Sequence, residues 1–283
     1  MHLTIPEILW ALVLAGHLML LIILMGRDRI RSFPWFTAAI AVSTTRLLAD
    51  HLLHGKITTL AFYWQSYSSM AVDAIIGVLV LVELTRRVFS SGKAGLLLKP
   101  KGWLGWTLIT FVISIAAVWA WGPWPSWKAL NADPQQLPLL LVVLTALKGQ
   151  LFLALLTVQV AILMRLFGPR FGFGWKSHAQ QIALGLSTNA LGLLVVQGIT
   201  DTIKRNVHLT TREQYEHVVR LVTNIDNAHF ALWFIVLLWL IVWMWRDEPG
   251  PSSTAMTPIP VEELPGEPLI PLTLEGTEPG IAT

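Results

Sequence analysis

Long apolar segments alternate with short polar ones through most of this chain. A transmembrane helix needs about 20 mostly apolar residues, and seven segments come close to or exceed that length. They are Pro6–Met25, Trp35–Leu53, Ala61–Thr85, Trp103–Trp121, Leu137–Phe167, His178–Ile203 and Thr223–Trp245. The pattern predicts an all-α fold, an integral membrane bundle of seven transmembrane helices.

The first and the last predicted helices each carry a further signal in the sequence. The first apolar segment has no basic residues before it and continues past any small-residue cleavage site to Met25. We therefore expect a retained helix rather than a cleaved signal. The last helix is expected to begin before its apolar part, near Thr211, because Thr210 and Glu213 have the spacing of a capping box.

The chain changes character after residue 246. Residues 247–283 are acidic and rich in proline, and they contain no Lys or Arg. Such a segment cannot bury enough apolar surface to form a core. We expect a transmembrane domain over 1–246 and a disordered, acidic, Pro-rich cytoplasmic tail over 247–283. A solvated tail is the favoured interpretation, and binding of a cytoplasmic protein partner is the alternative.

Basic residues concentrate in alternate loops, which predicts the orientation. The first, third and fifth loops are the basic ones. The sixth loop departs from this alternation, because it contains Lys204, Arg205, Arg212 and Arg220. The basic loops carry Arg27, Arg29, Arg31, Arg86, Arg87, Lys93, Lys99, Lys101, Arg165, Arg170 and Lys176. Cytoplasmic loops carry the excess of Lys and Arg, so the N-terminus is predicted outside and the C-terminus in the cytoplasm. The same loops are candidate contacts for anionic lipid or a protein partner.

Composition supports the membrane interpretation. Hydrophobic residues make up 54% of the chain and charged residues 13%, against about 25% charged residues in soluble domains. The chain has no cysteine, which excludes thiolate nucleophiles, Cys-ligated zinc and iron–sulfur clusters. The net charge of +3 follows from the basic loops. The expected large partner is therefore a lipid bilayer and not nucleic acid.

Charged side chains inside the apolar segments are the main functional signal. A charge at bilayer depth is costly unless it is paired or hydrated. Ser43, Arg46, Asp50 and His54 share one face of the second segment, and His51 lies beside them. Arg46 has two candidate partners, Asp50 one turn away and Asp73 on the third segment.

Other predicted helices add polar groups in the middle or outer half of the membrane. Their convergence predicts a hydrated pocket that opens outward and binds a small polar or anionic ligand or an ion. Its residues are Arg46, Asp50, His51, Asp73, Lys148, Asn189, Asp201, Asp226 and His229. Structural roles are the alternative, since Lys148 could neutralise Asp73, and Asp201 could lie at headgroup level. Glu83, near Arg86 and Arg87, is expected in an interfacial ion pair.

No catalytic residues are predicted. The last helix has no Schiff-base lysine, and the chain contains no GxSxG, HExxH or Walker A motif. The sequence leaves an enzymatic activity open but favours a protein that is not an enzyme, and we expect no cofactor. A zinc-dependent intramembrane hydrolase is the alternative, because three histidines and a carboxylate suit zinc. Its ligands would be His51, His54, Asp226 and His229.

Three short segments resemble an uncharacterised group of bacterial multi-pass membrane proteins of acidobacterial type. They are Arg31–Phe36 (RSFPWF), Ala61–Tyr67 (AFYWQSY) and Glu83–Phe89 (ELTRRVF). The resemblance implies a multi-pass membrane protein and brings no activity with it. The leading hypothesis is a receptor-like binding or sensing protein of the bacterial inner membrane. The alternatives are a small or proton-coupled transporter, the zinc hydrolase, and a structural subunit of a membrane complex.

Overall fold

The computed structural model describes residues 4–53, 55–90, 101–121, 124, 137–168, 176–206 and 211–247. Within these ranges the elements are seven α-helices, and there is no strand. They are α1 (Ile5–Gly26), α2 (Pro34–Leu53), α3 (Thr59–Ser90), α4 (Lys101–Ala120), α6 (Leu137–Phe167), α7 (His178–Asn206) and α8 (Arg212–Trp245). His54, much of the predicted basic loops and the predicted tail from 248 onward lie outside the described residues.

The helices have the length and composition of a multi-pass membrane protein. Five of those described, α1, α3, α6, α7 and α8, are long and apolar enough to cross a membrane. In α4 the described apolar part is shorter, Thr107–Ala120. Helix α2 has 20 residues but carries Arg46 and Asp50 in its second half, which lowers its hydropathy. The prediction of an all-helical membrane protein is confirmed at this level.

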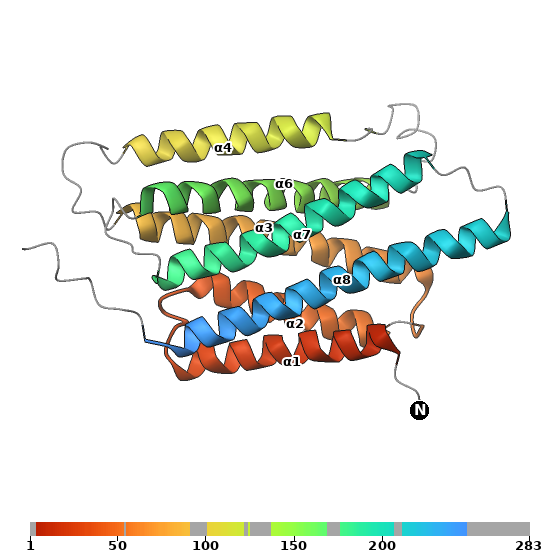
Figure 1. The fold of residues 1–283 in the computed structure, drawn as a ribbon, viewed down its shortest axis with the longest axis horizontal. Coiled ribbons are helices and arrows are strands. Elements are labelled where there is room, and N and C mark those ends of the chain that lie inside the picture. Colours follow the sequence, from red (N-terminus) through yellow and green to blue (C-terminus); the bar gives the residue numbers. More distant parts are fainter. Residues whose placement is uncertain are drawn as a thin grey trace, which may run out of the picture. The chain divides into compact units, whose positions relative to one another are not determined.

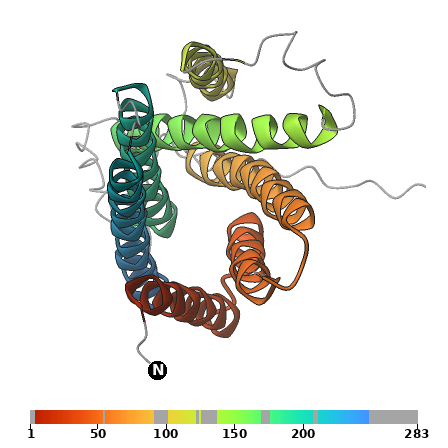
Figure 2. The ribbon, with the colours of Figure 1, turned by 90° about the vertical axis from the view of Figure 1, so that its right-hand side faces the viewer.

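Six of the helices pack in a closed sequence of neighbours. Helix α1 packs against α2, α2 against α3, α3 against α6, α6 against α7, α7 against α8, and α8 returns to α1 (Figure 1). We call this arrangement the six-helix ring. Helix α4 packs on α6, on the outer side of the ring (Figure 2). The absence of intramembrane charge in α4 fits this peripheral place.

The apolar core fills one half of the six-helix ring. All six helices contribute fully buried side chains, which include Leu20, Leu24, Phe36, Leu84, Met164, Ile182, Leu237, Leu240 and Met244. Small residues bring the helices together here. A Cβ on Gly16 would lie 3.1 Å from Leu237, and one on Gly185 would lie 3.1 Å from Leu240. Such close approach of backbones is typical of membrane helices.

Beyond this core lies an end of the bundle that we call the arginine end, after Arg27, Arg29, Arg87 and Arg246. Helix α2 starts here without a capping side chain of its own, because Phe33 precedes Pro34. The carboxylate of Glu83, on α3, accepts hydrogen bonds from the backbone N–H groups of Trp35 (3.3 Å) and Phe36 (3.0 Å). Glu83, which we expected in an interfacial ion pair, thus caps α2 from another helix.

Helix α8 begins where the sequence predicted, but its capping box is one residue later. Thr211 Oγ1 accepts a hydrogen bond from Gln214 N (3.3 Å), and Gln214 Oε1 accepts one from Thr211 N (3.4 Å). Thr210 lies outside the described residues. At about 1.5 Å per residue, the 34 residues of α8 span about 51 Å. The helix is therefore longer than the roughly 30 Å hydrocarbon layer.

Candidate functional site

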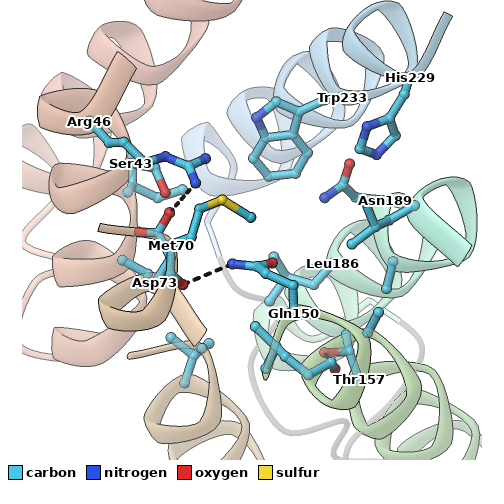
Figure 3. Close-up of a pocket in the computed structure, with 18 of the residues that line it drawn as sticks. Ser43, Arg46, Met70, Asp73, Gln150, Thr157, Leu186, Asn189, His229 and Trp233 are labelled. Atoms are coloured by element: carbon cyan, nitrogen blue, oxygen red, sulfur yellow. Dashed lines mark hydrogen bonds and ion pairs between the residues drawn. The ribbon is translucent and has the colours of Figure 1, made fainter. Parts of the chain in front are cut away.

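A cavity of about 390 Å³ with both polar and apolar walls lies inside the six-helix ring, next to the apolar core. All six ring helices line it, and no residue of α4 does. Its polar side chains are His17, Ser43, Arg46, Asp73, Gln150, Thr157, Asn189, Gln197, His229 and Trp233. Figure 3 shows most of them, with the Arg46 and Asp73 side chains facing Trp233, His229 and Asn189 across the space.

An ion pair forms one wall of the cavity. Arg46 Nη1 lies 2.9 Å from Asp73 Oδ2, and their side chains are 28% and 12% exposed (Figure 3). The sequence left two partners open for Arg46, and the structure selects Asp73 over Asp50. Adjacent packing of α2 and α3 puts the two charges side by side. The pair thereby compensates the cost of placing a charge at membrane depth.

The facing wall comes from α7 and α8 and carries unsatisfied polar atoms. Asn189 Oδ1, Gln197 Oε1 and His229 Nε2 are buried and have no hydrogen-bond partner among the described residues. Gly192 makes room for the imidazole, since a Cβ there would lie 3.2 Å from His229 Cδ2. Buried polar groups normally find partners in protein or ordered water. These atoms are therefore available to a ligand or to water.

His17 of α1 is buried at the edge of the same cavity. Its Nδ1 bonds the backbone carbonyl oxygen of Val13 at 2.8 Å, while Nε2 has no partner among the described residues. The ring lies 5.7 Å from that of Trp233, between centroids. A single imidazole in this setting is a packing group with one polar edge on the cavity.

Sequence reasoning assigned Lys148 of α6 to the pocket and missed Gln150 and Thr157, which line the cavity. Gln150 Nε2 donates a hydrogen bond to the carbonyl oxygen of Met70 (3.1 Å), which joins α6 to α3 at the cavity (Figure 3). Gln150 and Thr157 are seven residues apart and line the cavity on one stripe of the helix. The intramembrane charge of Lys148 drew attention to a different face. The signal that could have found the correct stripe was the Gln–Thr spacing rather than the charge.

Lys148 and Asp201, both predicted pocket residues, meet at another place. Lys148 Nζ donates to the carbonyl oxygen of Trp121 (2.5 Å) and lies 4.8 Å from the centre of the Trp124 ring. Trp121 Nε1 donates to Asp201 Oδ2 at 3.2 Å. We call these four residues the Trp121 cluster. It joins the end of α4 to α6 and α7, and none of its residues lines the cavity.

The remaining predicted residues do not line the cavity either. His51 stacks on Trp10, with ring centroids 3.9 Å apart. Asp226 is exposed. Asp50 Oδ1 is buried without a partner among the described residues. Of the nine predicted pocket residues, Arg46, Asp73, Asn189 and His229 are the ones that share the cavity.

The described members of the alternative zinc set, His51, Asp226 and His229, do not form a metal-binding group. In the described part of the chain, no three His, Cys, Asp or Glu side chains lie close enough to hold a metal ion together. His51 stacks on an indole, whereas His229 lines the cavity. His54 lies outside the described residues. The described geometry therefore does not support the zinc-hydrolase interpretation.

Comparison with known proteins adds no assignment. The sequence matches no protein-family model, no curated protein and no solved structure. The site must be interpreted from its own chemistry. It offers one ion pair, several neutral donors and acceptors, and apolar walls, a combination typical of small-molecule binding sites.

Proposed function

We propose that this chain is a seven-span protein of a bacterial inner membrane that binds, and thereby senses, a small polar ligand in the cavity of the six-helix ring. One observation carries the proposal. The cavity combines the Arg46–Asp73 ion pair with unpartnered polar atoms on Asn189, Gln197 and His229. Polar groups are expensive to keep inside a membrane protein without use.

The proposed orientation makes the arginine end cytoplasmic, as the basic loops predict. The apolar core then lies between the cavity and the cytoplasm, and a ligand enters from outside. A one-sided cavity above a packed core suits sensing, because the ligand does not need to pass through.

Helix α8 is the proposed route for the signal. It places His229 and Trp233 on the cavity and ends at the arginine end. There Arg27 Nη1 lies 3.2 Å from Asp247 Oδ1, and Arg29 Nη2 donates to the carbonyl oxygen of Arg246 (3.3 Å). A ligand that binds one position of α8 better than another shifts the population toward it. The acidic segment that follows Asp247 would present the change to a cytoplasmic partner.

A cavity-filling variant tests the proposal. Ala190 is buried and lines the cavity, whereas its neighbour Leu191 is half-exposed on the outer face of α7. Purified protein is screened against a broad set of polar metabolites for ligands that raise its melting temperature. We expect hits with wild-type protein and with Leu191→Phe, and none with Ala190→Phe.

A loss of fold must be separated from a loss of the site. Ser43→Leu fills the cavity from the opposite wall, on α2, and should also abolish the ligand-induced shift. Circular dichroism and the melting temperature without ligand report on the fold of each variant. Equal ligand-induced shifts in wild-type protein and both filled variants would refute binding in this cavity.

A small transporter remains the second candidate, supported by the partly buried ion pair. In that case Asp73 would exchange partners during a transport cycle. Lys148, which the sequence offered as a group that could neutralise Asp73, contacts Trp121 and Trp124 instead. Uptake of a hit compound into proteoliposomes, lost in Asp73→Asn but kept in Asp226→Asn, would favour transport over sensing.

A further inference from the structure

We infer that the ligand is a small zwitterion with an amino-acid head, whose carboxylate binds Arg46 and whose ammonium group binds Asp73. This inference rests on the proposed function and names the chemical class of its ligand. The sequence predicted a small polar or anionic ligand or an ion. The charge balance of the cavity narrows this prediction to a ligand that carries one charge of each sign.

The charge balance of the cavity favours a ligand of zero net charge. Among the described residues that line it, Arg46 is the basic side chain and Asp73 the acidic one, beside the imidazoles of His17 and His229, and Arg46 and Asp73 pair with each other. An anion or a cation would add an uncompensated charge to a partly dehydrated site, which is costly. A zwitterion adds one charge of each sign and keeps the site neutral.

The geometry of the ion pair leaves room for both ends of such a ligand. The pair is formed by Arg46 Nη1 and Asp73 Oδ2. This contact uses one of the two terminal guanidinium nitrogens and one of the two carboxylate oxygens. A guanidinium presents five donors in a planar fork that matches a carboxylate, and a carboxylate accepts several bonds from an ammonium group.

The rest of the cavity suits the remainder of a small metabolite. Its volume of about 390 Å³ is near the lower end of ligand pockets, which span roughly 300–1,000 Å³. Across from the ion pair, Asn189 and His229 offer unpartnered polar atoms, and Trp233 and Phe230 add aromatic surface. An amide or hydroxyl group on the ligand would satisfy the polar atoms of this wall.

Asp50 is a further acidic side chain that acts electrostatically on Asp73, and it makes the comparison with amines important. It follows Arg46 by one turn of α2 and lies outside the cavity lining. Its negative charge favours the ammonium end of a ligand. A simple amine is therefore the most demanding competitor of a zwitterion at this site.

Matched probes separate the charge classes on the wild-type full chain in detergent. The zwitterions are L-alanine, L-glutamine and L-leucine. Each is paired with its amine (ethylamine, 4-aminobutanamide, isopentylamine) and its acid (propanoate, 4-carbamoylbutanoate, 4-methylpentanoate). The apparent Kd comes from the concentration dependence of the melting temperature. Because bonds to charged groups are strong, we expect at least one zwitterion to bind roughly tenfold or more tightly than both its analogues.

Neutral substitutions at Arg46 and Asp73 should then change which class of probe, zwitterion, amine or acid, binds most tightly. Asp73→Asn leaves Arg46 uncompensated and should shift the preference to the acids. Arg46→Gln leaves Asp73 uncompensated and should shift it to the amines. The double variant keeps a neutral cavity and serves as a folding control, because replacing both partners of a buried pair is often tolerated. Asp226→Asn removes an exposed acid and should leave the preference unchanged.

The outcomes separate this inference from the proposed function. If an amine or an acid binds the wild-type protein as tightly as its zwitterion, and Ala190→Phe abolishes that binding, the zwitterion inference fails and the binding cavity stands. An unchanged preference in both single variants also overturns the inference. If no probe of any class shifts the melting temperature, but the broad screen gives hits that Ala190→Phe abolishes, the zwitterion inference fails and the binding cavity stands. If the broad screen gives no such hits either, both proposals are contradicted.

Discussion

The Glu83 carboxylate, on α3, caps the N-terminus of α2, and its removal should destabilise the protein. Glu83 replaces the missing N-cap side chain of α2 and binds the N–H groups of Trp35 and Phe36. Loss of an N-cap costs about 0.5–2 kcal/mol, and a negative charge at a helix N-terminus adds about 0.3–1 kcal/mol. We therefore expect Glu83→Ala to lower the free energy of unfolding by about 1–3 kcal/mol. Glu83→Gln keeps one acceptor oxygen and should cost about half as much or less.

Two measurements check this prediction. Equilibrium unfolding in mixed micelles gives the change in the free energy of unfolding. Hydrogen–deuterium exchange locates it, because the amides of Trp35 and Phe36 should exchange faster in Glu83→Ala. Protection in the distant first turn of α8, at Gln214, should stay unchanged.

A double-mutant cycle decides between the cap and the ion pair that the sequence suggested. If Glu83 acts as a cap, Glu83→Ala costs nearly the same in the wild-type, Arg86→Gln and Arg87→Gln backgrounds. The reasoning is refuted if the cost disappears in either arginine background, or if exchange at Trp35 and Phe36 does not change.

Three further predictions concern packing and capping. Gly77→Leu should destabilise the protein by about 1–3 kcal/mol, because even a Cβ at this position would overlap the Leu153 side chain; a melting temperature equal to that of wild type would contradict this overlap. Lys148→Met removes the bond to the Trp121 carbonyl oxygen and should speed exchange at the end of α4 without changing ligand affinity, whereas weaker binding would place Lys148 in the site. Thr211→Ala should fray the first turn of α8 at a cost of about 1 kcal/mol, seen as faster exchange there, and unchanged exchange would exclude the cap.

The helices were largely predictable because each is encoded locally. Apolar length gave every segment, and the bounds of Leu137–Phe167 agree with the structure. Helix ends differ more where polar residues continue the helix beyond the apolar part, as in α3, which runs to Ser90. Helix caps differed in how well the sequence predicts them. Thr211 caps α8 through Gln214, three residues away, and a local pattern can show such a cap. Glu83 caps a helix that is remote in sequence, and no local pattern shows that contact.

The candidate site was predictable only in part. Intramembrane charge and polarity pointed to Arg46, Asp73, Asn189 and His229, and these four share the cavity. The same criterion also selected Lys148 and Asp201, which meet at the Trp121 cluster. A charge on a membrane helix must find a partner, but the sequence does not say whether that partner is a ligand, another helix or a backbone carbonyl.

The sequence by itself determined that this is a helical membrane protein, because hydrophobic length and helix propensity act along a single segment. It also determined which residues are costly in a membrane. Only the tertiary structure decided which of those residues meet. Helix rotation and packing order, set by side-chain fit and by small residues such as Gly192, turn Arg46 toward Asp73 and place Lys148 beside Trp121. These contacts join distant parts of the chain, and no local pattern encodes them.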